Sequence, residues 1–158
     1  MALRPLLPLL LFLGLSAEAP VAPAPDPGQC VGHPGPIHIW VNVEGLTSSD
    51  GLVAVTLYAD DSRKFLAKRG SLYVGRAPAH APTTRVCLNL PHTGVFALGV
   101  YHDRNANRRF DRTGIGLPAE PFGFSNNPST LFGLPSFSSV RLNVPRTGLS
   151  TTVKLKNR

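Results

Sequence analysis

The sequence predicts an all-β domain in which two antiparallel sheets pack as a sandwich of about seven strands. Apolar residues recur at every second position in several segments, which is the spacing of strands with one buried face. No segment has the 3.6-residue spacing of a long amphipathic helix, and 15 glycines and 16 prolines among 158 residues indicate frequent turns. An immunoglobulin-like or transthyretin-like sandwich is typical of this pattern.

The expected strands follow one another from residue 37 to the end of the chain. In the first of them Ile37, Ile39, Val41 and Val43 alternate with residues that would face the other side. Gly, Pro, Asn and Asp separate the segments, as turns require. Residues 60–68 are polar and allow at most one helical turn, whereas 72–74 can add a short strand. The alternating segments are 37–43, 53–57, 86–90, 96–100, 140–144 and 153–155.

The chain divides into three parts. Arg4, a leucine-rich run and the small residues up to Ala19 have the pattern of a secretory signal peptide, predicted at residues 1–19. Residues 20–36 are rich in proline and read as a linker, followed by a single sandwich domain over 37–158. No other apolar stretch is long enough for a membrane helix. The mature protein is therefore expected outside the cytoplasm, periplasmic or extracellular, without a transmembrane span.

Cysteine content and charge agree with export. Cys30 and Cys87 are the only two cysteines, and an even pair in an oxidising compartment predicts a disulfide between them. The formal net charge of +7 fits acidic partners such as envelope polysaccharide or anionic lipid, and it fits plain solubility equally well. An envelope protein is a further partner class, whereas nucleic acid is not expected because an exported protein seldom meets it.

A polar segment near residue 105 has oxygen-bearing side chains at the spacing of a calcium loop. Asp103, Asn105, Asn107 and Asp111 occupy relative positions 1, 3, 5 and 9 of an EF-hand-like loop. The glycine expected at position 6 is Arg108, and the acidic residue expected at position 12 is missing. These four side chains are candidate ligands of a weak calcium site, and calcium is the one cofactor that the sequence suggests. The alternative is an Asx-rich turn that binds no ion.

Aromatic and amide residues follow in the same long interruption of the strand pattern. Aromatic rings beside glycines and amides can form a binding platform, and long loops in compact domains often carry function. The same aromatics can instead close the open end of the sandwich. The candidate ligand-binding residues are Phe122, Phe124, Asn126, Asn127 and Phe132.

Several motifs resemble a known family. They are Tyr101-His102-Asp103 with the Asn and Asp residues after it, Gly116-Leu117-Pro118, the run 123–127, and Phe132-Gly133 followed by Pro135-Ser136-Phe137. In this order they resemble the bacterial exported family catalogued as domain of unknown function 2141. The resemblance covers about residues 38–156. It implies a signal peptide, an envelope or extracellular location, a β-sandwich and no established activity.

The sequence favours a non-catalytic binding module over an enzyme. It has no Gly-x-Ser-x-Gly elbow, P-loop or His-Glu-x-x-His motif. We therefore expect an exported envelope or extracellular module of unknown ligand, with a structural or accessory envelope protein as the alternative. A second alternative is a hydrolase that uses His102, Asp103 and Glu120 for acid–base chemistry. No nucleophile is evident beside those three residues.

Overall fold

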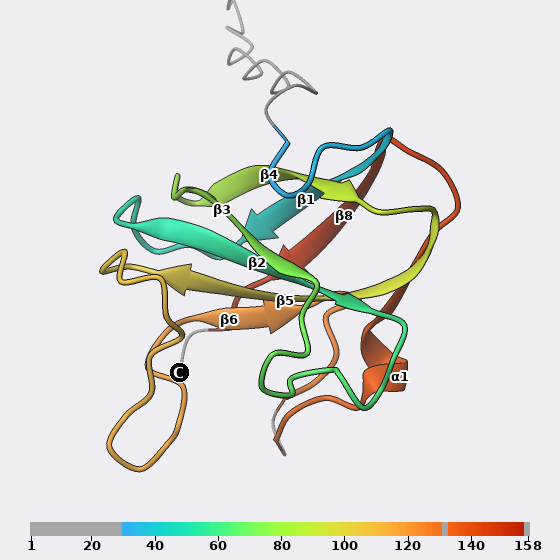
Figure 1. The fold of residues 1–158 in the computed structure, drawn as a ribbon. Coiled ribbons are helices and arrows are strands. Elements are labelled where there is room, and N and C mark those ends of the chain that lie inside the picture. The colour runs from blue at the N-terminus through green and yellow to red at the C-terminus, as the bar shows by residue number, and fades with distance from the viewer. Residues whose placement is uncertain (1–29, 131–132, 157–158) are drawn as a thin grey trace, which may run out of the picture.

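The computed structural model describes residues 30–130 and 133–156. Within this part of the chain, eight strands and one four-residue helix are joined by loops (Figure 1). The predicted signal peptide at residues 1–19 and the first part of the predicted linker, 20–29, lie outside the described residues. The elements are β1 (Ile37–Glu44), β2 (Leu52–Ala59), β3 (Tyr73–Pro78), β4 (Thr83–Leu90), β5 (Gly94–Asp103), β6 (Phe122–Phe124), α1 (Phe137–Val140), β7 (Arg141–Val144) and β8 (Leu149–Lys154).

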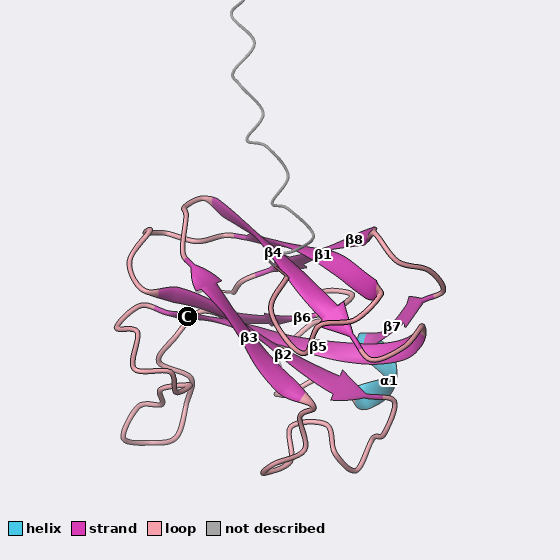
Figure 2. Ribbon diagram, turned by 45° about the horizontal axis from the view of Figure 1, so that its top comes forward, coloured by secondary structure: helices cyan, strands magenta, loops and turns pink. Residues whose placement is uncertain are grey.

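The strands form two layers, as the sequence predicts. A three-stranded sheet has the order β4-β1-β8, and a five-stranded sheet has the order β3-β2-β5-β6, with β7 also paired to β5 (Figure 2). Neighbouring strands are antiparallel except β1 and β8, which run parallel from Ile39↔Leu149 to Glu44↔Lys154. The chain reaches β8 from β7 on the other sheet rather than through a hairpin, so a parallel pairing is available to it. The all-β sandwich prediction is confirmed.

The core lies between the two sheets and is built from the alternation seen in the sequence. In β2, Val53, Val55 and Leu57 are fully buried between the layers, and Phe96 and Leu98 of the neighbouring strand β5 lie on the same inner face of the sheet. Burying such side chains stabilises a fold by about 1.5–3 kcal/mol each. The alternating apolar face is therefore the main reason why these segments form a sandwich.

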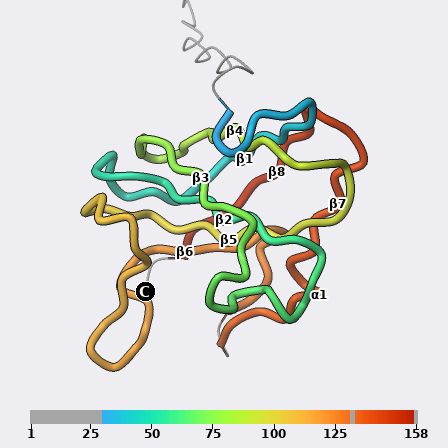
Figure 3. The backbone as a smooth tube through the Cα atoms, in the orientation of Figure 1, coloured from blue at the N-terminus to red at the C-terminus, as the bar shows by residue number. Residues whose placement is uncertain are grey.

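The outer face of the five-stranded sheet is also covered, and this was not predicted. A second apolar cluster lies there, and loops 60–72 and 104–121 and the described parts of loop 125–136, residues 125–130 and 133–136, run over that side of the sheet (Figure 3). Phe122 and Phe124 belong to this cluster as part of strand β6, whereas the sequence analysis placed them in a loop. Between them, Gly123 lets β6 approach β8, because an added Cβ would lie 2.5 Å from the Lys154 carbonyl oxygen.

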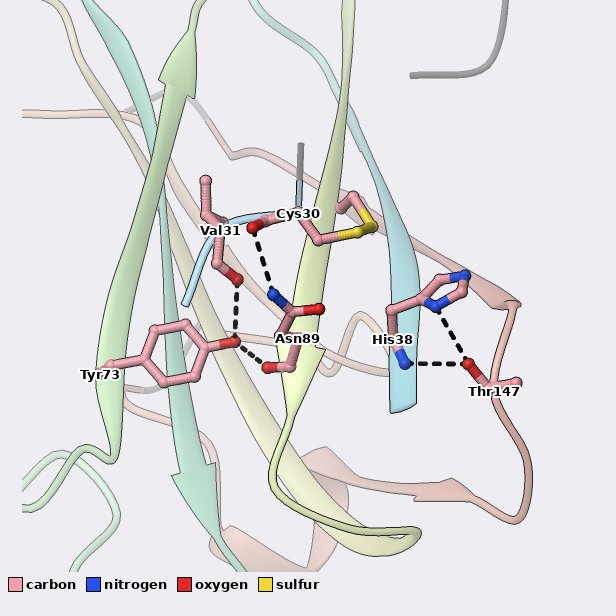
Figure 4. The surroundings of a disulfide bond; sticks show 7 residues. Cys30, Val31, His38, Tyr73, Asn89 and Thr147 are labelled. Carbon is pink, nitrogen blue, oxygen red and sulfur yellow. Dashed lines mark hydrogen bonds between the residues drawn. A yellow bond between two sulfur atoms is a disulfide. The ribbon is translucent and has the colours of Figure 1, made fainter. Parts of the chain in front are cut away.

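A disulfide between Cys30 and Cys87 ties the segment before β1 to strand β4, which confirms the predicted pairing (Figure 4). The backbone N–H of Val31 donates to the Cys87 carbonyl oxygen at 2.9 Å, and the Asn89 N–H donates to the Val31 carbonyl oxygen at 2.9 Å. The last part of the predicted linker is thus held against the edge of the three-stranded sheet. The described part of the chain contains no helix with the length and apolarity that a bilayer crossing requires.

Candidate functional site

The predicted calcium loop begins at the end of β5, where Asp103 is fully buried. Its carboxylate accepts two backbone hydrogen bonds, from the N–H of Asn107 at 3.0 Å and from the N–H of Arg108 at 2.7 Å. Ala106 and Arg108 adopt left-handed φ values of 55° and 63°. Arg108 thus takes the conformation for which the calcium-loop pattern uses glycine, and its N–H points at the carboxylate as a result.

The other three candidate calcium ligands, Asn105, Asn107 and Asp111, lie together, with Asp111 at the centre. Its Oδ2 atom accepts from the side-chain amides of Asn105 at 2.9 Å and Asn107 at 2.7 Å. The Asp111 N–H in turn donates to Glu120 Oε2 at 3.1 Å. Burial raises the pKa of the Glu120 carboxyl, and the neighbouring charges of Asp103 and Asp111 raise it further. The fold therefore brings all four predicted ligands together and adds Glu120 to them.

The loop satisfies its oxygens with its own donors in this arrangement. The two asparagine amides point their nitrogens at Asp111, so they would have to rotate to offer oxygens to a cation. Among residues 30–130 and 133–156, no three or more His, Cys, Asp and Glu side chains are grouped so as to hold a metal ion. Calcium binding by this loop stays a prediction.

The predicted ligand-binding asparagines hold the chain together just after β6. The Asn126 side chain donates to the Arg141 carbonyl oxygen at 2.7 Å. The Asn127 side chain donates to the Thr152 carbonyl oxygen at 2.9 Å and accepts from the Lys154 N–H at 2.7 Å. Their amides are thus engaged with neighbouring backbone. The fifth predicted residue, Phe132, lies outside the described residues.

An apolar groove of about 240 Å³ lies over the outer face of the five-stranded sheet. Its floor contains two small residues that face each other across β2 and β5, Thr56 and Gly99, and Phe124 of β6 lies opposite Gly99. Tyr58 and Tyr101 stand on opposite sides of this row, because each lies two residues along its strand. The small residues leave space between larger aromatic walls.

Loop residues complete the walls of the groove. Phe110 contributes its ring, which meets Tyr101 edge to face with a 5.3 Å centroid separation and Phe122 at 5.9 Å. Leu66 comes from loop 60–72 and Leu134 from loop 125–136. Of the predicted ligand-binding residues, Phe122 and Phe124 line this groove. Three loops far apart in the sequence therefore enclose one apolar space.

A few polar groups border the groove. Burial raises the pKa of the Tyr58 hydroxyl. It also raises the pKa of the Tyr101 hydroxyl, an effect that the Arg76 guanidinium partly offsets. Both tyrosines are therefore neutral near pH 7 and keep an O–H donor. Arg112 carries the cationic side chain of the lining, and its guanidinium carbon lies 5.4 Å from the centre of the Phe110 ring.

The sequence analysis missed most of this groove, although a signal for it was present. Tyr58, Gly99 and Tyr101 occupy the outward positions of β2 and β5, where a solvent-facing sheet would carry polar side chains. Apolar residues on both faces of a strand indicate that both faces are covered. That pattern predicts that the outer sheet face is covered, but it does not predict which loops cover it.

The three residues of the hydrolase alternative do not face one another. His102 and Asp103 are adjacent in β5, so their side chains lie on opposite faces of the sheet. The His102 ring is fully buried, and its Nε2 atom is 2.8 Å from the Asp50 carbonyl oxygen. Glu120 interacts with the loop on the Asp103 side instead. This arrangement provides no shared acid–base site for the three groups.

Comparisons with known proteins point to one family. No curated protein and no solved structure matched the chain. A family model described as an uncharacterized protein conserved in bacteria (DUF2141) matches residues 41–153. The match begins within β1 and ends within β8, so it includes both sheets, the Asp103 loop and the groove. The chain therefore belongs to this family of uncharacterized bacterial proteins, as the resemblance of its sequence motifs indicated.

Proposed function

We propose that the protein is an exported, non-catalytic binding module that takes an apolar ligand into the groove above β2, β5 and β6. The observation that carries the proposal is the groove itself, about 240 Å³ of apolar space with small residues at its floor. Apolar cavities of about 150 Å³ already accept benzene, so a ring or a bent alkyl chain fits the space. Ligand sites typically combine such an apolar lining with a few polar groups.

The floor of the groove offers a direct way to test this proposal. A Cβ at Gly99 would make ordinary contacts of 3.7 Å with Phe124 and Tyr58, and it would need no left-handed backbone. A larger side chain at this position would therefore extend into the groove rather than strain the sheet. Gly99 thus keeps open a space that a leucine would fill.

Export is part of the same proposal. The leucine-rich start of the chain supports it, and the Cys30–Cys87 disulfide supports it because such bonds persist in oxidising compartments. Envelope polysaccharide, anionic lipid and envelope protein remain the partner classes for the module. A structural or accessory envelope protein would need no ligand in the groove, so a ligand-binding measurement distinguishes that role from a binding module.

The experiment is a titration with N-phenyl-1-naphthylamine, a neutral apolar fluorophore. We expect saturable, one-to-one binding by the protein and at least about a tenfold loss of affinity in Gly99→Leu. Gly114→Leu is the matched control, because it adds the same side chain where nothing lies within 4 Å. Near-ultraviolet circular dichroism shows whether each variant keeps its packing. Absence of binding, or equal binding by a folded Gly99→Leu protein, would refute the proposal.

A further inference from the structure

Four of the five exposed large hydrophobic residues of the described chain lie in the loops on one side of the molecule. They are exposed by 38% at Leu66, 46% at Leu117, 62% at Leu134 and 84% at Ile115, whereas the fifth, Leu72, lies beside the segment before β1. Leu66 and Leu134 border the groove, so loops 60–72 and 125–136 meet there. Figures 1 and 2 show loops 60–72 and 104–121 extending away from the three-stranded sheet. The exposed apolar residues are thus concentrated rather than scattered.

Ile115 stands at the tip of a turn that holds itself in place. The Thr113 N–H donates to the Leu117 carbonyl oxygen at 2.8 Å, and the Gly116 N–H donates to the Thr113 carbonyl oxygen at 2.8 Å. Arg112 Nη1 donates to the Gly116 carbonyl oxygen at 2.9 Å. A Cβ added at Gly116 would meet nothing within 4 Å. The turn therefore projects from the rest of the fold and presents Ile115 and Leu117 beside a cation.

Two of these loops carry half of the 16 lysines and arginines of the chain. Loops 60–72 and 104–121 together contain eight Lys and Arg residues and four Asp and Glu residues, against a net charge of +7 for the whole chain. Two of the four carboxylates are already paired, Asp60 with Arg141 at 2.7 Å and Asp61 with Arg63 at 3.2 Å. The other two, Asp111 and Glu120, accept hydrogen bonds within the Asp103 loop. The outward charge of this side is positive.

From these observations we propose that loops 60–72 and 104–121, together with the loop segment 133–136, dock the protein on an anionic lipid surface. Side chains such as Ile115 and Leu134 would enter the boundary between headgroups and acyl chains, while the lysines and arginines stay at the level of the phosphates. An anionic polysaccharide would satisfy the cations equally, but it offers no apolar phase for exposed leucine and isoleucine. The combination of apolar tips with surrounding cations favours the membrane, and it does not depend on a ligand in the groove.

The test is sedimentation of the exported protein, freed of its predicted signal peptide, with lipid vesicles. We expect binding to vesicles of phosphatidylglycerol mixed with phosphatidylcholine, weaker binding to pure phosphatidylcholine, and a decrease as salt rises. Ile115→Ser and Leu134→Ser should each lower binding at least about fivefold, because both side chains lose a buried apolar contact with lipid. Arg109→Gln and Lys68→Gln should each lower it about fivefold.

Matched controls separate this docking from other interactions. Arg146→Gln removes the same charge from an exposed position in the β7–β8 connection and should leave binding unchanged. Gly99→Leu fills the groove and should also leave vesicle binding unchanged, so the two proposals can fail separately. The inference is overturned if anionic vesicles do not bind the protein, or if the loop variants bind as the unaltered protein does. It is also overturned if Arg146→Gln weakens binding as much as Arg109→Gln, which would indicate attraction by net charge alone.

Discussion

Removal of the Cys30–Cys87 disulfide should lower the free energy of unfolding by about 4 kcal/mol. The bond joins cysteines separated by 57 residues. In the chain-entropy model, releasing a loop of that length returns to the unfolded chain an entropy that corresponds to about 4 kcal/mol at 25 °C. Domains of this size are typically stable by about 5–15 kcal/mol, so the loss is a large share of the total.

The contacts around the bond determine how much of the native structure survives its loss. Without the covalent link, the segment before β1 keeps the Val31 hydrogen bonds to β4 and the bond from the Asn89 side chain to the Cys30 carbonyl oxygen at 3.2 Å. Val31 also packs against Gly75, where an added Cβ would lie 2.4 Å from its side chain. We therefore expect the double variant Cys30→Ser with Cys87→Ser to fold with this segment still in place.

Urea denaturation measures the effect directly. The midpoint should fall in the double variant, and the reduced unaltered protein should match it. Reductant should do nothing further to the double variant, which controls for effects of the reagent itself. A loss below about 1 kcal/mol would contradict the reasoning, since it would mean that the unfolded chain gains little freedom when this loop opens.

Two further predictions concern the loop after β5. Asp103→Ala should cost about 2–4 kcal/mol, because two backbone N–H groups lose a buried carboxylate acceptor, and thermal unfolding in a calcium chelator measures this cost. If the loop binds calcium, addition of the ion at one to ten times its Kd should stabilise the unaltered protein by about 0.4–1.4 kcal/mol. The stability of Asp103→Ala should then not change with calcium. An unchanged thermal unfolding midpoint in the unaltered protein would identify a plain Asx-rich turn. Glu120→Gln tests the raised pKa of that carboxyl. Because its pKa is raised in the folded state, the contribution of Glu120 to the free energy of unfolding is largest below the ordinary value of 4.5 and declines as pH rises through the raised pKa. The glutamine variant should lack this decline, and parallel pH profiles of unfolding for the two proteins would contradict the assignment.

The two-sheet architecture was predictable because the inner faces of the long strands repeat with a period of two. Val53, Val55 and Leu57 predict which face of β2 packs between the two sheets. Strand β6 was missed because it has only three residues, too few for alternation to be recognised. Its place depends instead on Gly123 and its approach to β8, a tertiary contact that no local pattern reports.

The groove could be predicted only in part, since its parts come from distant segments. Phe122 and Phe124 were predicted from composition as candidate binding residues, and both line the groove. Thr56 and Gly99 were not identified, because a small residue in a strand does not indicate a groove unless its cross-strand neighbours are known. The register of β2 against β5 places these two residues side by side in the groove floor. Alternation in the sequence shows which residues share a face, but it does not distinguish registers that differ by two residues.

The Asp103 loop shows why side-chain spacing alone does not identify a metal site. Oxygens at alternate positions can converge on a cation, and they can equally accept N–H groups from a chain that bends around them. The choice depends on how many donors the loop itself supplies. Here Arg108 takes a left-handed conformation and directs its N–H at Asp103, while Asn105 and Asn107 donate to Asp111. Calcium would have to replace the two amide donors and overcome the charge of nearby arginines, so only a weak site is compatible with this loop, and its hydrogen bonds hold its shape without an ion.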